Sequence, residues 1–417
     1  MKIRVTSVPS TAAKIASNLL LAVLILFGLL LFFPWDQMTV RNASKSIPGF
    51  SAPNPGSYYN TQSIEKDNGS LLRIMEEPTS TIGTTNFTSL PRALYQMAKP
   101  VFDALPDEFL PGYKSPCWVI RTNAKDNKIR CLPYFYILGT PKSGTSDLWD
   151  KISGHPDVIG GILKEPHWWT RRRLDGVSFE SYLQGRSTKL VNTFNQDASN
   201  KDKLIVGDGS ASTLWDNHNW MEAFGVRKEG PEFVTAQILR AVQPNAKLFV
   251  ILREPVSRLY SGHLYFHRKP HPGRFHNDSV ETIARFHRCT ATLSARACAY
   301  TTSQQKGVRL NIGLYAIYIR DWLKVFPRDQ MFILRLEDWH EDCTEILPNI
   351  YAFLNLNNLS EDKIMEICQS RTINTNLRTA HKVGDMFNET RTILQEFYSG
   401  WNQELSELLG DERFLWH

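Results

Sequence analysis

The chain has 417 residues, which is enough for one large catalytic domain with attached segments. Hydrophobic residues make up 42% of it and aromatic residues 11%, which excludes a chain that is disordered throughout. The formal net charge of +6 indicates attraction to an anionic partner, but it does not distinguish a polysaccharide from a nucleic acid or a lipid headgroup.

The N-terminal stretch 15–35 contains no charged residue, and its length suits one membrane-spanning helix of about 20 residues. The alternative is a cleaved signal peptide, whose apolar core is usually about 7–15 residues long, and "PWDQM" is a poor cleavage site. We therefore predict a transmembrane signal-anchor helix at 15–35 behind a cytoplasmic tail at 1–14. Lys2, Arg4 and Lys14 precede the span and place the rest of the chain in the lumen.

Residues 36–115 are rich in Ser, Thr, Asn and Pro and predict a lumenal stem that holds a domain away from the membrane. The stretch 90–105 predicts a short helix near the end of this stem. Asn-x-Ser/Thr sequons are weak signals one by one, but six of them support exposure to the lumen. The candidate glycosylation sites are Asn42, Asn68, Asn86, Asn277, Asn358 and Asn388.

Six cysteines are compatible with disulfides in an oxidising compartment, although six cysteines allow 15 pairings and the sequence does not fix the connectivity. Cys289 and Cys298 are close enough for a local bridge. Proximity alone makes two further pairs plausible, Cys117 with Cys131 and Cys343 with Cys368. Because none of the cysteines has C-x-x-C spacing, we do not expect a zinc site.

From about Pro116 onward, apolar runs of strand length alternate with helical patterns. The runs at 134–140, 203–210, 247–254 and 330–338 predict strands. Helical patterns begin after Gly144, at Pro255 and at Gly313. Continuous apolar strands that alternate with helices predict an α/β domain with a central parallel sheet flanked by helices.

The loop 139–146 follows the first of these strands and precedes a helix, a context in which backbone N–H groups bind an anion. Its glycines have the spacing of a Walker A loop, but Thr145 stands at the position of the lysine, and Lys142 lies inside the loop. An ordinary strand-to-helix turn is the structural alternative. A kinase would also need Mg²⁺, for which Asp208 is the candidate ligand.

A second anion site is predicted at the end of the strand 247–254. Arg253 and, two turns into the next helix, Ser261 are suitable partners for a phosphate. Together, "TPKSGTS" and "LREPVSRLYSGH" resemble the two donor-binding loops of Golgi carbohydrate sulfotransferases, which use 3′-phosphoadenosine 5′-phosphosulfate. The resemblance implies that Arg253 and Ser261 hold the 3′-phosphate of this donor. It assigns the 5′-phosphosulfate to Lys142, Ser143, Gly144, Thr145 and Ser146.

Further stretches resemble the branch of this family that adds sulfate to the 6-hydroxyl of N-acetylgalactosamine 4-sulfate in chondroitin or dermatan sulfate. They are "KEPHWWTRRR", "GDGSASTLWDN", "RACAY", "VRLNIGLYAIYIRDWL", "ILRLED" and "FLWH". The resemblance covers roughly residues 115–417 and leaves out the stem. "NLRTAHKVGDM" is only loosely like the basic loop of the family, so no role is assigned to Arg378 or Lys382.

In "LKEPHWW", Glu165 is the general base that the resemblance implies, since a hydroxyl that attacks sulfur must lose its proton. An ion pair at the surface is the structural alternative for this carboxylate. Lys142 and His167 complete the predicted catalytic set, in which Lys142 offsets charge on the leaving oxygen. The predicted acceptor contacts are Lys164, Trp168, Arg171, Arg172 and Arg173.

The sequence therefore predicts a single-pass type II Golgi membrane protein with a P-loop-like α/β sulfotransferase domain at 116–417 in the lumen. We expect 3′-phosphoadenosine 5′-phosphosulfate as donor, no metal requirement, a sulfated glycosaminoglycan acceptor and no nucleic-acid partner. A homodimer is compatible with the sequence, which does not fix the oligomeric state. The alternatives are a heparan-type sulfotransferase, a lumenal P-loop kinase and a non-catalytic glycan-binding protein.

Overall fold

The computed structural model describes residues 90–416 except 124–125, 197–199, 218–220, 222–223, 302–306 and 371–376. The predicted cytoplasmic tail, the predicted membrane span, most of the predicted stem and three of the sequons, Asn42, Asn68 and Asn86, lie outside the described residues. Within the described part of the chain, no helix combines the length and the apolar character needed to cross a membrane.

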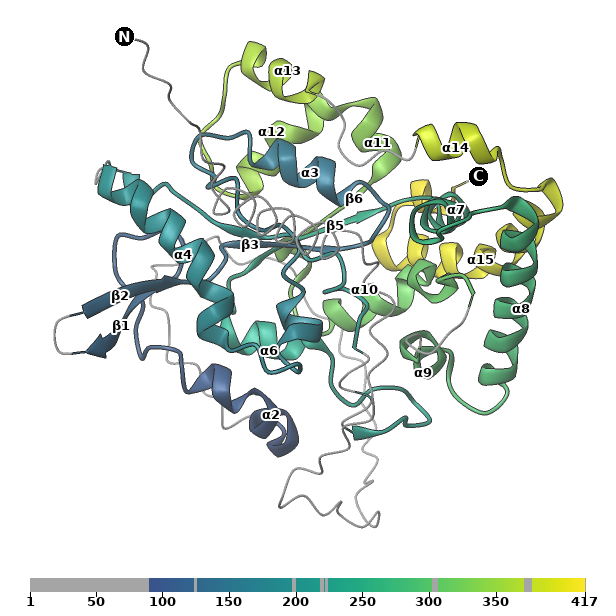
Figure 1. Cartoon of the computed structure of the whole chain (residues 1–417), viewed down its shortest axis with the longest axis horizontal. Coiled ribbons are helices and arrows are strands. Elements are labelled where there is room, and N and C mark those ends of the chain that lie inside the picture. The colour runs from purple at the N-terminus through teal and green to yellow at the C-terminus, as the bar shows by residue number, and fades with distance from the viewer. Residues whose placement is uncertain are drawn as a thin grey trace, which may run out of the picture. The chain divides into compact units, whose positions relative to one another are not determined.

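A parallel sheet of four strands forms the centre of the domain (Figure 1), which confirms the predicted parallel sheet flanked by helices. The strand order is β4-β3-β5-β6, and β4 pairs with β3 over only two residues of each strand. All four strands lie within the apolar runs that predicted them. They are β3 (Phe135–Gly139), β4 (Gly207–Asp208), β5 (Lys247–Leu252) and β6 (Met331–Arg335).

The sheet is buried on both faces because alternate residues of its strands enter two different hydrophobic layers. Phe135 and Ile137 pack in one layer with residues of α3 (Thr145–Ile152) and α12 (Cys343–Phe353). Tyr136 and Leu138 pack in the opposite layer with residues of α6 (Thr235–Val242), α7 (Pro255–Phe266) and α10 (Tyr315–Leu323). Figure 1 shows α3 and α12 on one side of the sheet and α6 and α10 on the other.

Helix α2 (Arg92–Phe102) confirms the short helix predicted near the end of the stem. Its residues Leu94, Ala98, Val101 and Phe102 recur at helical spacing, and all are buried in the same core layer as Tyr136 of the sheet. The packed domain therefore includes α2, and it begins earlier in the chain than the boundary at 116 that the sequence suggested.

The first two strands form a separate antiparallel hairpin that the sequence analysis did not predict, β1 (Cys117–Asn123) and β2 (Asp126–Cys131). Cys117 lies opposite Cys131 in this hairpin, and the two are joined by a disulfide. The other disulfides are Cys289–Cys298 and Cys343–Cys368, so all three pairs are the neighbours that the sequence made plausible.

Further helices are α4 (Phe179–Gln196), α8 (Pro272–Thr290), α9 (Ala295–Tyr300), α11 (Leu336–Glu341), α13 (Glu361–Gln369), α14 (Leu377–Val383) and α15 (Asn388–Leu409). Several of them extend the two hydrophobic layers, α11 and α13 in the layer of Phe135 and α8 and α15 in the layer of Tyr136. A π-helix spans Trp168–Arg172, and 3-10 helices span Leu310–Gly313, Arg328–Gln330 and Glu412–Leu415.

Candidate active site

The loop 139–146 joins β3 to α3 and is held by its own hydroxyl groups, since the hydroxyls of Thr140 and Ser143 lie 2.7 Å apart. Gly144 begins α3 with a φ of +86°, and a Cβ atom there would lie 2.4 Å from Leu336, so glycine is required. The predicted phosphosulfate-binding residues lie in this loop or in the first turn of α3: Lys142, Ser143, Gly144, Thr145 and Ser146.

Lys142 has a φ of +69°, and its ammonium lies 3.8 Å above the centre of the Tyr265 ring. Burial and the neighbouring charge of Arg253 lower the pKa of Lys142 to about 8, against the opposing influence of Glu165. The lysine therefore offers a partly desolvated cation in the middle of the anion-binding loop.

Arg253 follows the carboxyl end of β5 and reaches the loop, where its guanidinium donates to the carbonyl oxygen of Lys142 over 3.5 Å. Glu254 caps the start of α7 by accepting from the backbone N–H groups of Val256 and Ser257. Ser261 lies farther along the same helix. The strand β5 and its helix thus bring Arg253 into contact with the donor loop, and α7 carries Ser261.

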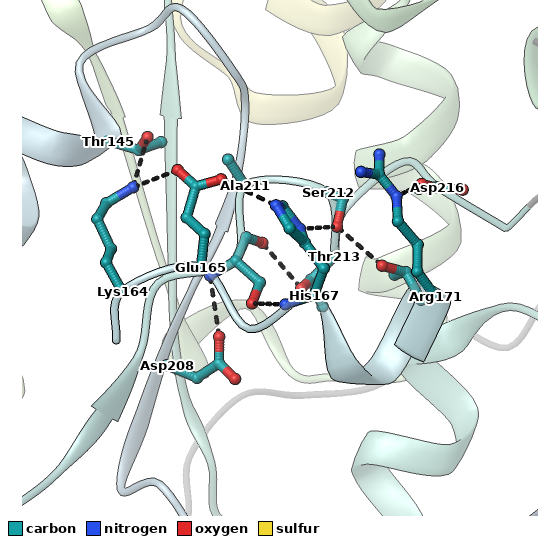
Figure 2. Close-up of polar contacts among 12 residues, drawn as sticks. Thr145, Lys164, Glu165, His167, Arg171, Asp208, Ala211, Ser212, Thr213 and Asp216 are labelled. Carbon is teal, nitrogen blue, oxygen red and sulfur yellow. Dashed lines mark hydrogen bonds and ion pairs between the residues drawn. The ribbon is translucent and has the colours of Figure 1, made fainter. Parts of the chain in front are cut away.

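Lys164, Glu165 and His167 form one polar cluster (Figure 2). The Lys164 ammonium donates to Glu165 Oε1 over 2.6 Å and to the Thr145 hydroxyl over 3.3 Å. His167 Nε2 lies 3.0 Å from Glu165 Oε2. Because Thr145 belongs to the donor loop, Lys164 connects the predicted base directly to that loop.

The Glu165 carboxylate is ionised at neutral pH. Burial raises its pKa, but the hydrogen bond from His167 and the charge of Lys164 prevail and lower the pKa to about 2. Each oxygen of a carboxylate has two lone-pair sites, so the contacts with Lys164 and His167 leave acceptor capacity on both oxygens. The group can therefore accept a hydroxyl proton, although its low pKa makes it a weak base at rest.

Two serines that sequence analysis did not identify hold His167 in place. The backbone N–H of His167 donates to Ser210 Oγ over 3.0 Å, and its Nδ1 lies 2.7 Å from Ser212 Oγ. Ser212 also contacts the Thr170 hydroxyl over 2.8 Å. Both serines follow β4, at the carboxyl edge of the sheet where ligands of α/β proteins bind, and that position was the available signal.

Asp208, the proposed magnesium ligand of the kinase alternative, is buried and occupied by protein groups. One of its oxygens accepts from the Ser210 N–H over 2.9 Å. The other accepts from the Tyr182 hydroxyl over 2.7 Å and lies 3.6 Å from the Arg186 guanidinium. Through Ser210, Asp208 therefore helps to position the segment that contacts His167. These contacts do not favour a role as a metal ligand.

Trp168 does not fit the predicted role of a sugar-stacking residue. Its side chain is only 2% exposed, and its ring stacks on Tyr182 with 4.8 Å between the centroids. Its indole N–H donates to the carbonyl oxygen of Val177 over 2.9 Å. The ring belongs to the hydrophobic core, and this burial does not support the predicted contact with the acceptor.

The three successive arginines point to different surroundings. Arg171 donates to Asp216 over 2.6 Å, while Arg172 is exposed. Arg173 is directed into the domain, where it donates to the carbonyl oxygen of Met97 over 3.4 Å, and burial lowers its pKa to about 10. The predicted basic contact surface therefore does not include Arg173.

Residues 133–383 match the family of sulfotransferase domains. Carbohydrate sulfotransferase 15 of Mus musculus is 35% identical to this chain, over 76% of this chain and 67% of that protein. Carbohydrate sulfotransferase 15 of Homo sapiens is 34% identical, over 86% of this chain and 74% of that protein. The bifunctional heparan sulfate N-deacetylase/N-sulfotransferase 4 of Mus musculus is 25% identical, over 75% of this chain and 34% of that protein.

The family match extends from the residues before β3 to the end of α14, so it includes the donor loop, the cluster around Glu165 and the arginine after β5. The identity to the two carbohydrate sulfotransferases extends over most of the chain. This chain belongs to the sulfotransferase family and, within it, to the carbohydrate sulfotransferases.

Proposed function

We propose that the chain transfers a sulfuryl group from 3′-phosphoadenosine 5′-phosphosulfate to the 6-hydroxyl of N-acetylgalactosamine 4-sulfate in chondroitin or dermatan sulfate. The observation that carries this proposal is the position of Lys164, which contacts both the donor loop and the base. It joins Thr145 to Glu165 and so brings the two halves of a transfer reaction to one point at the carboxyl edge of the sheet.

In the proposed step, the acceptor oxygen forms a bond to sulfur while the bond between sulfur and the bridging phosphate oxygen breaks. The hydroxyl proton passes to the Glu165 carboxylate. The Lys142 ammonium stabilises the negative charge that develops on the bridging oxygen, as preorganised cations do in other transfer reactions. His167 and Lys164 hold Glu165 in position for this transfer.

The described residues fit this donor at both of its anionic ends. The loop 139–146 and the N-terminus of α3 suit the phosphosulfate. Arg253 and Ser261 suit the 3′-phosphate. Beyond the carboxyl ends of β5 and β6, a cavity of about 640 Å³ is lined by Arg253 and Ser257 among others, and this volume lies within the range of pockets that hold small ligands.

The acceptor is proposed from the resemblance to the chondroitin and dermatan branch, which includes "KEPHWWTRRR" and the C-terminal "FLWH". The higher identity to carbohydrate sulfotransferase 15 than to the heparan sulfate N-deacetylase/N-sulfotransferase supports the same choice. The heparan-type enzyme is the alternative within the family, because the base motif resembles that of heparan-modifying relatives.

The test is transfer by the purified chain from radiolabelled donor, with a chelator present, to chondroitin 4-sulfate, dermatan sulfate, heparan sulfate and desulfated chains. Disaccharide analysis should find the label on the 6-position of 4-sulfated N-acetylgalactosamine. Label on heparan chains alone would show that the chain is the heparan-type enzyme and that the proposed acceptor is wrong. Metal-dependent phosphate transfer from ATP would support the kinase, and glycan binding without any transfer would support a non-catalytic protein.

We also propose that the chain is a single-pass type II protein of the Golgi membrane, with its catalytic domain in the lumen. Three disulfides among the described residues support an oxidising compartment. The sequon asparagines Asn277, Asn358 and Asn388 are exposed, as glycan attachment requires. The apolar stretch 15–35 supplies the proposed anchor.

A further inference from the structure

Two large aromatic side chains are exposed at the C-terminal end of α7, in a domain that buries most of its aromatic residues. Tyr265 is 53% exposed and Phe266 is 39% exposed. Their rings contact each other edge to face, with 4.9 Å between the centroids. Adjacent exposed aromatic rings indicate a binding surface more often than scattered apolar residues do.

This aromatic pair lies against the catalytic centre. The Lys142 ammonium is 3.8 Å above the centre of the Tyr265 ring. Lys164 links Glu165 to Thr145, which follows Lys142 in the donor loop. A hydroxyl that receives sulfate beside Lys142 and gives its proton to Glu165 therefore places its own sugar chain within reach of Tyr265.

Further basic residues lie against the rings or near them in the sequence. The Arg309 guanidinium lies 4.0 Å above the centre of the Phe266 ring. Arg268 and Lys269 follow the pair in the sequence after His267, and both are exposed. We name the surface formed by Tyr265, Phe266, Arg268, Lys269 and Arg309 the aromatic ridge.

A sulfated glycosaminoglycan presents two kinds of surface, the apolar C–H faces of its sugar rings and its sulfate and carboxylate groups. Exposed tyrosine and phenylalanine rings suit the first, and arginine and lysine side chains suit the second. Trp168, which the sequence suggested for stacking, is only 2% exposed. The aromatic ridge offers both chemistries next to the reacting atoms.

We infer that the aromatic ridge binds the sulfated acceptor chain, with Tyr265 stacking on a sugar ring next to the one that receives sulfate. This inference rests on the proposed function, because it names the part of the same site that holds the acceptor. It makes Tyr265 a positioning residue, which sets where the acceptor hydroxyl lies and takes no part in bond breaking.

The test compares Tyr265→Ala, Tyr265→Phe and Phe266→Ala with the unchanged chain. Tyr265→Ala should raise the acceptor KM and weaken binding of a 4-sulfated chondroitin hexasaccharide roughly 10-fold, the scale of one lost aromatic contact. Tyr265→Phe keeps the ring and should bind normally. Phe266→Ala should show a smaller loss, because its ring is less exposed. Phe387→Ala is the matched control, since Phe387 is also exposed, at 47%, and lies at the start of α15.

The alternative role for the Tyr265 ring is to position Lys142 for donor binding. Calorimetry with 3′-phosphoadenosine 5′-phosphate distinguishes the two roles. Binding of the bisphosphate should stay within about twofold in Tyr265→Ala, as expected when only acceptor contacts are removed. If Tyr265→Ala instead weakens bisphosphate binding and leaves acceptor binding unchanged, the ring positions Lys142 for the donor, and the inference is wrong. If the unchanged chain modifies no glycosaminoglycan at all, it is the proposed function that fails.

Discussion

At the scale of single residues, the proposed role of Lys142 requires a charge that its surroundings make less favourable. Its ammonium must be charged to stabilise the leaving oxygen, yet burial and Arg253 lower its pKa to about 8. The charge is therefore close to its titration point in the free protein. An anionic donor favours the charged form, so the pKa of Lys142 must rise when donor binds.

From this we predict different pH limits for the free protein and for its donor complex. The ratio kcat/KM for the donor should fall as pH rises through about 8, because deprotonated Lys142 no longer attracts it. The value of kcat should persist to higher pH. Full pH profiles of both quantities test this, and Lys142→Arg, which keeps its charge, should move the fall in kcat/KM upward. A fall at the same pH in both proteins would assign it to another group.

Glu165→Gln keeps the shape of the side chain but removes its capacity to take the hydroxyl proton. We predict that kcat falls roughly 100-fold, the usual scale for loss of a general base. Binding of 3′-phosphoadenosine 5′-phosphate, measured by calorimetry, should stay near normal. Glu366→Gln, an exposed change on α13, is the control. Normal turnover by Glu165→Gln on chondroitin 4-sulfate would mean that another residue is the base.

The candidate site could be predicted from sequence where its residues share one short motif. Arg253 directly follows β5, Lys142 lies in the loop that follows β3, and their spacing from glycine, serine and proline is visible in the printed sequence. Ser212 was not predicted, because it meets His167 only when the segment after β4 folds beside the base motif. The sequence suggested that Trp168 stacks on a sugar, but its ring lies in the core. Packing decides whether a tryptophan faces a ligand or the core, and packing is not visible in the sequence.

At the scale of elements, the π-helix Trp168–Arg172 explains why the basic triplet does not act as one surface. Successive residues of any helix leave its axis in different directions. Arg171 therefore meets Asp216, Arg172 is exposed, and Arg173 enters the domain toward α2. Only part of the triplet is placed to attract a polyanion.

We predict that Arg172→Ala impairs acceptor binding, whereas Arg173→Ala lowers stability. Arg172→Ala should raise the acceptor KM, and salt should diminish the difference from the unchanged chain because exposed charges are screened. Arg173→Ala should leave the acceptor KM near normal and lower the thermal unfolding midpoint, since it removes a half-buried side chain that contacts α2. Steady-state kinetics at two salt concentrations, with melting curves, distinguish the two. An equal rise in the acceptor KM for both variants would mean that Arg172 and Arg173 contact the acceptor as parts of one surface.

Helix α2 belongs to the catalytic domain by its packing, although its sequence neighbours suggested a stem. Leu94→Ala should lower the free energy of unfolding by about 2–5 kcal/mol, because Leu94 is fully buried and its loss leaves a cavity. Chemical denaturation measures the change. Gln96→Ala, on the exposed side of the same helix, should have little effect. If Leu94→Ala is as mild as Gln96→Ala, α2 does not contribute to the stability of the domain.

The central elements were predictable because the strands of a doubly covered parallel sheet are continuously apolar, as Phe135–Gly139 and Lys247–Leu252 are. The hairpin of β1 and β2 was not predicted. Its residues "CWVIRTN" and "DNKIRC" mix charged and apolar side chains, so the sequence has no clear strand period. The pairing of Cys117 with Cys131 and contacts with the rest of the domain decide its structure.

At the scale of the whole molecule, the proposed topology makes a prediction for the intact protein in membranes. Protease added to sealed microsomes should leave the bulk of the chain undigested, because the catalytic domain is enclosed. Peptide N-glycosidase should increase its mobility on a gel, since exposed sequon asparagines such as Asn277 and Asn358 are available for glycans. Digestion in sealed vesicles, with no shift on deglycosylation, would reverse the orientation.

The three disulfides share a property that bears on how the protein is made. Their partners are separated by 14, 9 and 25 residues, so each bond closes a short local segment. None of them needs the distant end of the chain before it can form. If the chain emerges progressively into an oxidising compartment, as the proposed topology implies, each bond can therefore form soon after its second cysteine emerges, with little need for later exchange between wrong partners.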